Sequence, residues 1–367
     1  MGILQPIWDG TFVYREPVCF SADKDGRPTG GTLLYQPEEI LSVTSFDGSV
    51  FYQPVRDYTA NGRQLVRTEA SRIPYLERSV YCKPFTGVPE TAWVRLSGGK
   101  AYMEVVSDVY RWQTLVTYTH RDKWAGFQPK TCGESLPRSM EKLRAGGDFH
   151  LTLYGDSITA GWEASGCNER AIDMVTLGEY HVSLWHAPYQ PAWAELVTNA
   201  LQARYPQSNV IKTNRAAGGS TVQWGVEHAA ELVPPCKPDL IMLGFGMNSM
   251  QESAEDYRRA ILSIIRTIRK ECHDCEFVLM SPMIPNPEIK GFQNNQLPAQ
   301  QDVLYQIAAE LEGVCIAPVH SVFREMTARG KHYLELTGNC INHPNDFSVR
   351  VYAQTVLRTL GVDGSDG

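Results

Sequence analysis

The chain has 367 residues, of which 43% are hydrophobic, and it carries a formal net charge of −7. This length exceeds the usual size of one hydrophobic core, so we expect two globular domains. The acidic balance excludes a basic surface for nucleic acid or anionic membranes, because such a surface needs clustered lysine and arginine. We therefore expect the partner to be a small or neutral molecule.

The first residues, "MGILQPIWDG", lack the basic and apolar regions of a secretion signal, and no stretch reaches the roughly 18 apolar residues of a membrane span. This predicts a soluble, cytoplasmic protein. Its nine cysteines show no framework spacing, which is typical of reduced, buried thiols. "CHDC" at 272–275 has no second pair at zinc spacing, so we read it as structural and expect neither a metal nor a cofactor.

Short alternating segments with turn dipeptides fill the chain up to about residue 145. Asp47-Gly48, Asn61-Gly62 and Gly98-Gly99 each separate two strand-like runs, which is the pattern of β-hairpins. Several short strands at such spacing predict a β-sandwich, jelly-roll-like domain over residues 1–145.

From residue 146 the pattern changes to alternating strands and helices. Ser253 is placed to cap a helix, and an apolar stripe follows it with helical spacing. This alternation predicts a parallel, doubly wound α/β sheet over residues 146–367. The expected strands are 149–154, 208–213, 239–244, 276–281 and 314–318, and the stripe consists of Tyr257, Ile261, Ile264, Ile265 and Ile268.

The loops after these strands carry residues suited to acyl transfer. Ser157 follows the first strand in "GDSIT", Gly219 lies in "TNRAAGGST" after the second, and Asn248 lies in "GFGMNSM" after the third. His343 stands in "NCINHPNDF" before the last helix. A histidine activates a serine hydroxyl, while backbone N–H groups and an amide side chain stabilise an oxyanion. Each motif alone is commonly a turn or a cap, but their order at strand ends, where ligands bind, favours catalysis.

These four blocks resemble the SGNH family of GDSL-type hydrolases over roughly residues 149–360. The resemblance implies that Ser157 is the nucleophile and one oxyanion donor through its N–H, that Gly219 and Asn248 are further donors, and that His343 is the base. It also implies a flavodoxin-like three-layer α/β/α fold and a metal-independent esterase or related hydrolase. The lipase elbow Gly-x-Ser-x-Gly is absent, which disfavours the α/β-hydrolase fold.

Three positions depart from the family pattern. Ala216 replaces the middle glycine of Asn-x-Gly-x-x-Gly, and Ser249 replaces the aspartate that follows Asn248. Cys340 occupies the place of the family's aspartate in Asp-x-x-His-Pro. Either a backbone carbonyl of "TGNCIN" or Asp346 can then orient the imidazole of His343, and we favour the carbonyl. Carbohydrate esterases of family 2 are similar in placing a β-sandwich before the SGNH domain, and there a Ser-His dyad with backbone support can suffice.

The segment from Trp162 to Trp193 is long for a strand-to-helix connection, which is typical of lids and binding loops. Trp162, Trp185, Tyr189 and Trp224 offer flat apolar faces for sugar rings, although aromatic residues also pack domains or subunit interfaces.

We therefore predict a serine esterase that removes O-acetyl groups from a small-molecule or oligosaccharide ester. A short-chain lipid-type esterase or thioesterase is the alternative within enzymes, and a carbohydrate-binding protein on a decayed hydrolase scaffold is the alternative outside them. The sugar, the acetylated position, the role of the N-terminal domain and a homo-oligomeric state stay open.

Overall fold

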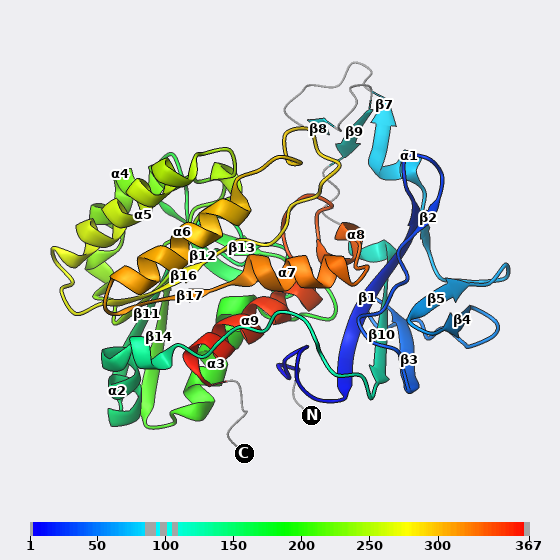
Figure 1. The fold of residues 1–367 in the computed structure, drawn as a ribbon, viewed down its shortest axis with the longest axis horizontal. Helices are drawn as coiled ribbons and strands as arrows, with labels where there is room; N and C mark the ends of the chain where they lie inside the picture. Colours follow the sequence, from blue (N-terminus) through cyan, green and yellow to red (C-terminus); the bar gives the residue numbers. More distant parts are fainter. Residues whose placement is uncertain (1–2, 85–92, 96–100, 105–108, 363–367) are drawn as a thin grey trace.

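The computed structural model describes residues 3–84, 93–95, 101–104 and 109–362. A parallel-sheet domain with flanking helices occupies one side of the molecule, and a β-rich N-terminal domain occupies the other (Figure 1). The predicted fold class is thereby confirmed. The predicted turn at Gly98-Gly99 lies outside the described residues.

Five parallel strands form the sheet of the larger domain, and all five were predicted to within two residues at each end. The first of them in sequence, β11, lies between β14 and β15, so the winding direction of the sheet reverses at β11. Ligands of doubly wound sheets bind at the carboxyl end of such a reversal. The order across the sheet is β14 (Ser208–Asn214), β11 (Gly147–Gly155), β15 (Leu240–Gly244), β16 (Glu276–Met280) and β17 (Val314–Ala317).

Alternate residues of these strands enter two separate cores, because successive strand side chains point to opposite faces. Leu153, Met242 and Val278 belong to one buried cluster, whereas Leu243 and Phe277 belong to the other. The first cluster includes residues of α3 (Trp193–Arg204), α7 (Val319–Ala328) and α9 (Asp346–Leu360), and the second includes residues of α4 (Val222–Leu232), α5 (Ala254–Arg269) and α6 (Leu297–Glu310).

Helix α5 begins and packs as its sequence predicts. The side chain of Ser253 accepts a hydrogen bond from the backbone N–H of Asp256, which satisfies one free donor of the first turn. Every residue of the predicted stripe is buried, namely Tyr257, Ile261, Ile264, Ile265 and Ile268.

The main sheet of the N-terminal domain is mostly antiparallel. β1 pairs with β10, and β10 pairs with β3. The predicted turns at Asp47-Gly48 and Asn61-Gly62 are present: Gly48 has φ +78° and Gly62, between β4 and β5, has φ +58°. The strands are β1 (Phe12–Ala22), β2 (Pro28–Thr29), β3 (Glu39–Ser45), β6 (Tyr75–Leu76) and β10 (Gln113–Thr119) in the main sheet, with β4 (Tyr58–Asn61) and β5 (Gln64–Arg67) as a hairpin, and β7 (Cys82–Pro84), β8 (Trp93–Arg95) and β9 (Ala101–Glu104) as a small sheet.

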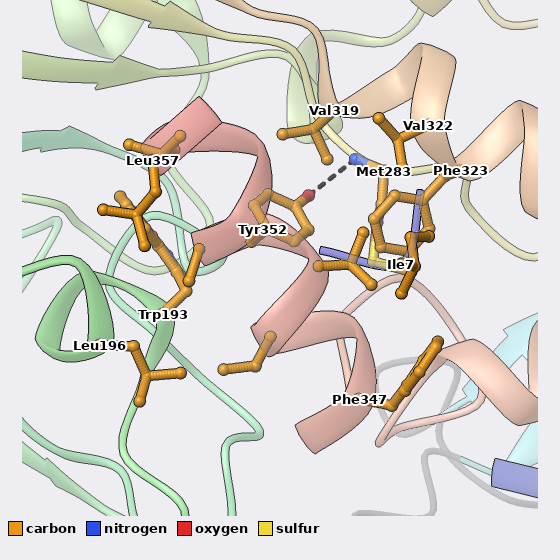
Figure 2. Packing of buried hydrophobic residues seen from close by; sticks show 14 of the residues in the cluster. Ile7, Trp193, Leu196, Met283, Val319, Val322, Phe323, Phe347, Tyr352 and Leu357 are labelled. Atoms are coloured by element: carbon orange, nitrogen blue, oxygen red, sulfur yellow. Dashed lines mark hydrogen bonds between the residues drawn. The ribbon is translucent and has the colours of Figure 1, made fainter. Parts of the chain in front are cut away.

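The last helix, α9, lies between the two domains and is buried along its whole length except at Arg358. Figure 2 shows Tyr352 of this helix among Trp193 and Phe323, with its hydroxyl accepting a 2.7 Å hydrogen bond from the backbone N–H of Met283. Ile7, near the N-terminus, reaches the same cluster. A helix covered on all sides is part of a core, so the two domains share one continuous interior.

A fully buried ion-pair group joins the two domains. Lys331 Nζ lies 3.0 Å from Glu16 Oε1 on β1 and 3.2 Å from Glu335 Oε2 on α8 (Tyr333–Leu336), and all three side chains are 0% exposed. Glu335 also accepts hydrogen bonds from the backbone N–H groups of Cys19 and Gly31. Every charge of this group therefore has a partner, as burial of charge requires.

The domain boundary at 145/146 stays a prediction. Helix α2 (Pro137–Ala145), just before it, contacts β11 and β14 of the parallel sheet. Lys142 on this helix bonds both carboxylate oxygens of Asp239, at 2.6 and 2.7 Å. The helix thus packs with the domain that follows it.

Candidate active site

Ser157 lies in a tight turn that the neighbouring strand holds in place. The carbonyl of Gly244, at the end of β15, accepts hydrogen bonds from the backbone N–H of Asp156 (3.2 Å) and the hydroxyl of Thr159 (2.7 Å). A Cβ at position 155 would lie 2.2 Å from the Gly244 carbonyl oxygen, so only glycine fits there. The turn fixes Ser157 directly beyond β11.

Asp156 supports this turn from inside. Its carboxylate accepts a 3.0 Å hydrogen bond from the backbone N–H of Ile158, and its side chain is buried. Burial raises the pKa of Asp156 to about 6, against the opposing effect of its hydrogen bonds.

His343 meets Ser157 across the carboxyl edge of the sheet. The hydroxyl oxygen of Ser157 lies 2.8 Å from Nε2 of His343, and both residues are buried. The loop that carries the histidine is ordered by Asn339, whose side-chain oxygen accepts from the backbone N–H groups of 341, 342 and 343. The two sequence motifs thus bring a hydroxyl group and an imidazole nitrogen to hydrogen-bond distance, which is the geometry that a serine nucleophile and its base require.

The two further donor candidates follow the strands on either side of β11. Gly219 follows β14 with φ +81°, and the side chain of Asn248, after β15, donates one N–H to the carbonyl of Ser220 at 3.0 Å. An amide carries two N–H donors, so Asn248 keeps one for a ligand. Within the described part of the chain, the backbone N–H groups of Ser157 and Gly219 have no acceptor from the protein. This arrangement suits stabilisation of an oxyanion.

Asn214, the asparagine that begins the "NRAAGG" motif, has a structural role. Asn214 accepts a hydrogen bond from the backbone N–H of Ala216 and donates to the carbonyl of Ala160. Ala216, which replaces the family's middle glycine, is buried and leaves the turn at Gly219 intact.

Neither expected partner of the histidine is in place. Both carboxylate oxygens of Asp346 accept hydrogen bonds from Ser165, at 2.8 and 2.7 Å, and neither is bonded to Nδ1 of the imidazole. Among the described residues, Nδ1 of His343 is buried and has no hydrogen-bond partner, so no carbonyl of "TGNCIN" reaches it. Instead, Glu163 Oε1 lies 3.7 Å from this nitrogen. Sequence reasoning missed Glu163, which belongs to no recognised block.

The aromatic candidates have three different environments. Trp162 is half-buried and meets the ring of His343 edge-on at 5.6 Å, while Trp185 is 65% exposed and lies 5.1 Å from Tyr189 between ring centroids. Trp224 is only 8% exposed, and its indole N–H bonds the carbonyl of Met174. The expectation that Trp224 presents a free face to a sugar is therefore wrong, because the indole packs inside its own domain.

The long connection between β11 and α3 forms a hairpin of β12 (Asn168–Ile172) and β13 (Glu179–Ser183). The backbone N–H of Ile172 bonds the carbonyl of Ala216, which holds the hairpin against the loop of Gly219. A Cβ at Gly218 would lie 2.6 Å from the Trp162 ring, so this indole packs directly on that loop. Trp162 thus borders both His343 and the loop of Gly219.

The sequence profile of the GDSL-like lipase/acylhydrolase family matches residues 153–348, more than half of the chain. No curated protein matches the sequence. No helix among the described residues is long and apolar enough to cross a membrane.

Several solved structures are similar to this chain. A two-domain esterase (CEX) active on acetylated mannans matches with a TM-score of 0.48 and 20% identity, over 65% of this chain and 55% of that chain. The acetylxylan esterase Axe2 from Geobacillus stearothermophilus matches with a TM-score of 0.46 and 20% identity, over 59% of this chain and 96% of that chain. An α/β hydrolase, LAE5, from the metagenome of Lake Arreo matches with a TM-score of 0.45 and 20% identity, over 61% and 100%.

Proposed function

Because the chain belongs to the GDSL-like lipase/acylhydrolase family, we propose that it is a serine carboxylic ester hydrolase that works through an acyl-enzyme. The observation that carries this proposal is the 2.8 Å contact between Ser157 Oγ and His343 Nε2 at the reversal point of the sheet. A serine hydroxyl is a weak nucleophile until a base accepts its proton, and this geometry provides the base.

The reaction then follows from the site. Nε2 of His343 takes the Ser157 proton as Oγ bonds to the ester carbonyl carbon, whose oxygen becomes an oxyanion facing Gly219 and Asn248. The proton passes to the alcohol oxygen as the C–O bond breaks, which leaves acyl-Ser157. Water then gives a proton to His343 and attacks the acyl carbon, and the returned proton restores the serine hydroxyl as the acid leaves.

For the substrate, we propose an O-acetyl ester of a carbohydrate. The indole of Trp162 stands against both His343 and Gly218, which limits the room for an acyl chain beside the nucleophile. Trp185 and Tyr189 are exposed on the loop that leads away from the site, and exposed aromatic faces bind the apolar face of a sugar ring. A small acyl group on a sugar alcohol fits both features.

Two measurements test this proposal. We expect a fluorophosphonate probe to label the wild-type protein and not Ser157→Ala, since the probe reacts only with an activated serine. Hydrolysis of p-nitrophenyl acetate should exceed that of the butyrate and octanoate esters, and acetylated oligosaccharides should lose mass as acetyl groups leave. An unlabelled wild type would contradict the esterase, whereas preference for octanoate would contradict only the acetyl substrate.

A further inference from the structure

The imidazole of His343 has one nitrogen whose role the four family blocks leave unassigned. Nε2 faces the nucleophile, while Nδ1 is buried and has no hydrogen-bond partner among the described residues. A catalytic histidine needs an acceptor at its second nitrogen, because that bond fixes the tautomer and the ring orientation. The structure must supply such a group within reach of Nδ1.

One carboxylate faces this nitrogen. Oε1 of Glu163 lies 3.7 Å from Nδ1 of His343, and the two side chains are only 13% and 11% exposed. Among the described residues, this carboxylate forms no other ion pair. Catalytic hydrogen bonds are often long in an unliganded enzyme and shorten when charge develops.

Other acceptors near the histidine are already engaged. Asp346 is bonded twice by Ser165, and the carbonyl of Cys340 accepts a 2.8 Å hydrogen bond from the side chain of Asn286. The side-chain oxygen of Asn339 is shared by three backbone N–H groups of the same loop. Glu163 is therefore the acceptor that geometry leaves available.

The backbone holds Glu163 in an uncommon conformation at this point. Its φ is +70°, in the left-handed region that a non-glycine residue rarely occupies. A Cβ at Gly338 would lie 2.9 Å from the Cβ of Glu163, and the N–H of Gly338 donates to the carbonyl of His343 at 2.9 Å. Residues held in this region cluster at functional sites, and here the conformation and the close glycine bring the carboxylate beside the base.

We propose that Glu163 is the positioning residue of His343, replacing the acid that Cys340 lacks. The carboxylate accepts the Nδ1 proton in a hydrogen bond and leaves Nε2 free to take the Ser157 proton. When His343 becomes an imidazolium, the negative charge of Glu163 stabilises it, and the Nδ1 proton stays on the imidazole throughout. This inference rests on the proposed serine esterase mechanism.

The test replaces the carboxylate by its amide. Glu163→Gln should lower kcat by about 10²- to 10⁴-fold with little change in KM, the effect expected when the orienting acid of a triad is lost. Glu163→Asp should recover part of the loss. The matched control is Asp346→Asn, which should keep kcat within about fivefold because that carboxylate faces Ser165.

Three readouts together separate positioning from a structural effect. A positioning role lowers kcat, leaves KM near its wild-type value, and lets the carboxylate of Glu163→Asp recover part of kcat. A purely structural role would instead lower the melting temperature of Glu163→Gln. Equal melting temperatures of wild type and variant confirm that both are folded.

The outcomes are distinguishable. If fluorophosphonate labels the wild type and Glu163→Gln keeps its kcat, the role of Glu163 is wrong while the esterase stands. If the wild type is not labelled, the esterase itself fails. A loss of kcat in Asp346→Asn as large as in Glu163→Gln would also overturn the assignment.

Discussion

The loops of Ser157 and His343 meet in one site but are held by different parts of the molecule. The serine turn takes its hydrogen bonds from the sheet of its own domain, through the carbonyl of Gly244 and the hydroxyl of Ser220, which bonds the carbonyl of Gly155. The histidine loop is held from the N-terminal domain. The proposed nucleophile is therefore held within the α/β/α domain, whereas the position of the proposed base depends on the N-terminal domain.

Gln113 on β10 makes this dependence specific. Its amide nitrogen donates to the carbonyls of Leu334 (2.7 Å) and Thr337 (2.8 Å), and its oxygen accepts from the side chain of Asn345 (3.0 Å). Asn345 caps α9 two residues after His343, and Gln113 is fully buried. One side chain of the β-rich domain thus forms hydrogen bonds both before and after His343 in its loop.

The largest expected effect comes from Ser157, the proposed nucleophile. Ser157→Ala should lower esterase turnover by several orders of magnitude, because no other group replaces the attacking hydroxyl. Its melting temperature should stay near that of the wild type, since the alanine fits the same turn. Retention of more than about a tenth of wild-type turnover would sink the assignment of Ser157.

The next largest effect is expected from Asn248, the proposed oxyanion donor that follows β15. Asn248→Ala should lower kcat by roughly 10²- to 10³-fold, the usual cost of one oxyanion donor, and should change KM much less. Steady-state kinetics on p-nitrophenyl acetate measure both constants. A raised KM with unchanged kcat would mean that Asn248 binds the ground state instead.

A smaller effect should follow from the N-terminal domain. Gln113→Ala should lower kcat by about 10- to 100-fold, because the histidine loop loses the hydrogen bonds of Gln113 and catalysis is sensitive to a small displacement of His343. It should also destabilise the fold by about 2–3 kcal/mol, since buried carbonyls lose their donor.

Gln301 provides the control for this variant. It is buried in the α/β/α domain and bonds Ser281 and Ser321. Gln301→Ala should destabilise the protein to a similar degree while leaving kcat unchanged. An equal loss of kcat in the two variants would show that general destabilisation, and not the loss of the Gln113 hydrogen bonds to the histidine loop, lowers kcat.

The smallest expected effect lies far from catalysis. Burial, and then Arg324, lowers the pKa of His320 to about 4. The unfolded chain binds a proton near pH 6.5 that the folded chain rejects until about pH 4, so this residue makes stability fall as pH drops through that window. Asp156, whose pKa is raised to about 6, makes stability change with pH in the opposite direction. Asp156 is present in the wild type and in any His320 variant, so it does not affect their difference.

Between pH 6.5 and 4.5, the free energy of unfolding of His320→Gln should therefore fall by roughly 2–3 kcal/mol less than that of the wild type. Urea unfolding at several pH values measures this, with the exposed His273→Gln as control. An unchanged slope would refute the buried, neutral state of His320.

The sequence predicted what local chemistry determines. Strand periodicity located all five parallel strands, the cap at Ser253 located α5, and the four motif blocks located Ser157 and His343, which the fold brings to 2.8 Å. These signals are short-range, or they belong to a known family pattern.

Contacts between distant segments were not predictable in this way. Nothing local marks Glu163, because its reach toward His343 depends on a left-handed φ and on Gly338, far along the chain. Gln113 is an ordinary strand residue until α9 is placed beside it. The burial of Trp224 could not be predicted for the same reason, since nothing near it in the sequence shows that its indole N–H bonds the carbonyl of Met174.

The buried group of Glu16, Lys331 and Glu335 has a consequence for the order of folding during synthesis. Glu16 leaves the ribosome long before its cation, since Lys331 follows this part of β1 by more than 300 positions and bonds the carbonyl of Pro17 across 314 of them. A domain synthesised first commonly folds first, but here β1 would bury a carboxylate that has hydrogen bonds from Leu34 and Tyr118 and no cation, which is costly. We therefore expect the nascent N-terminal sheet to stay open until translation is nearly complete, so that the histidine loop gains its support only in the finished chain.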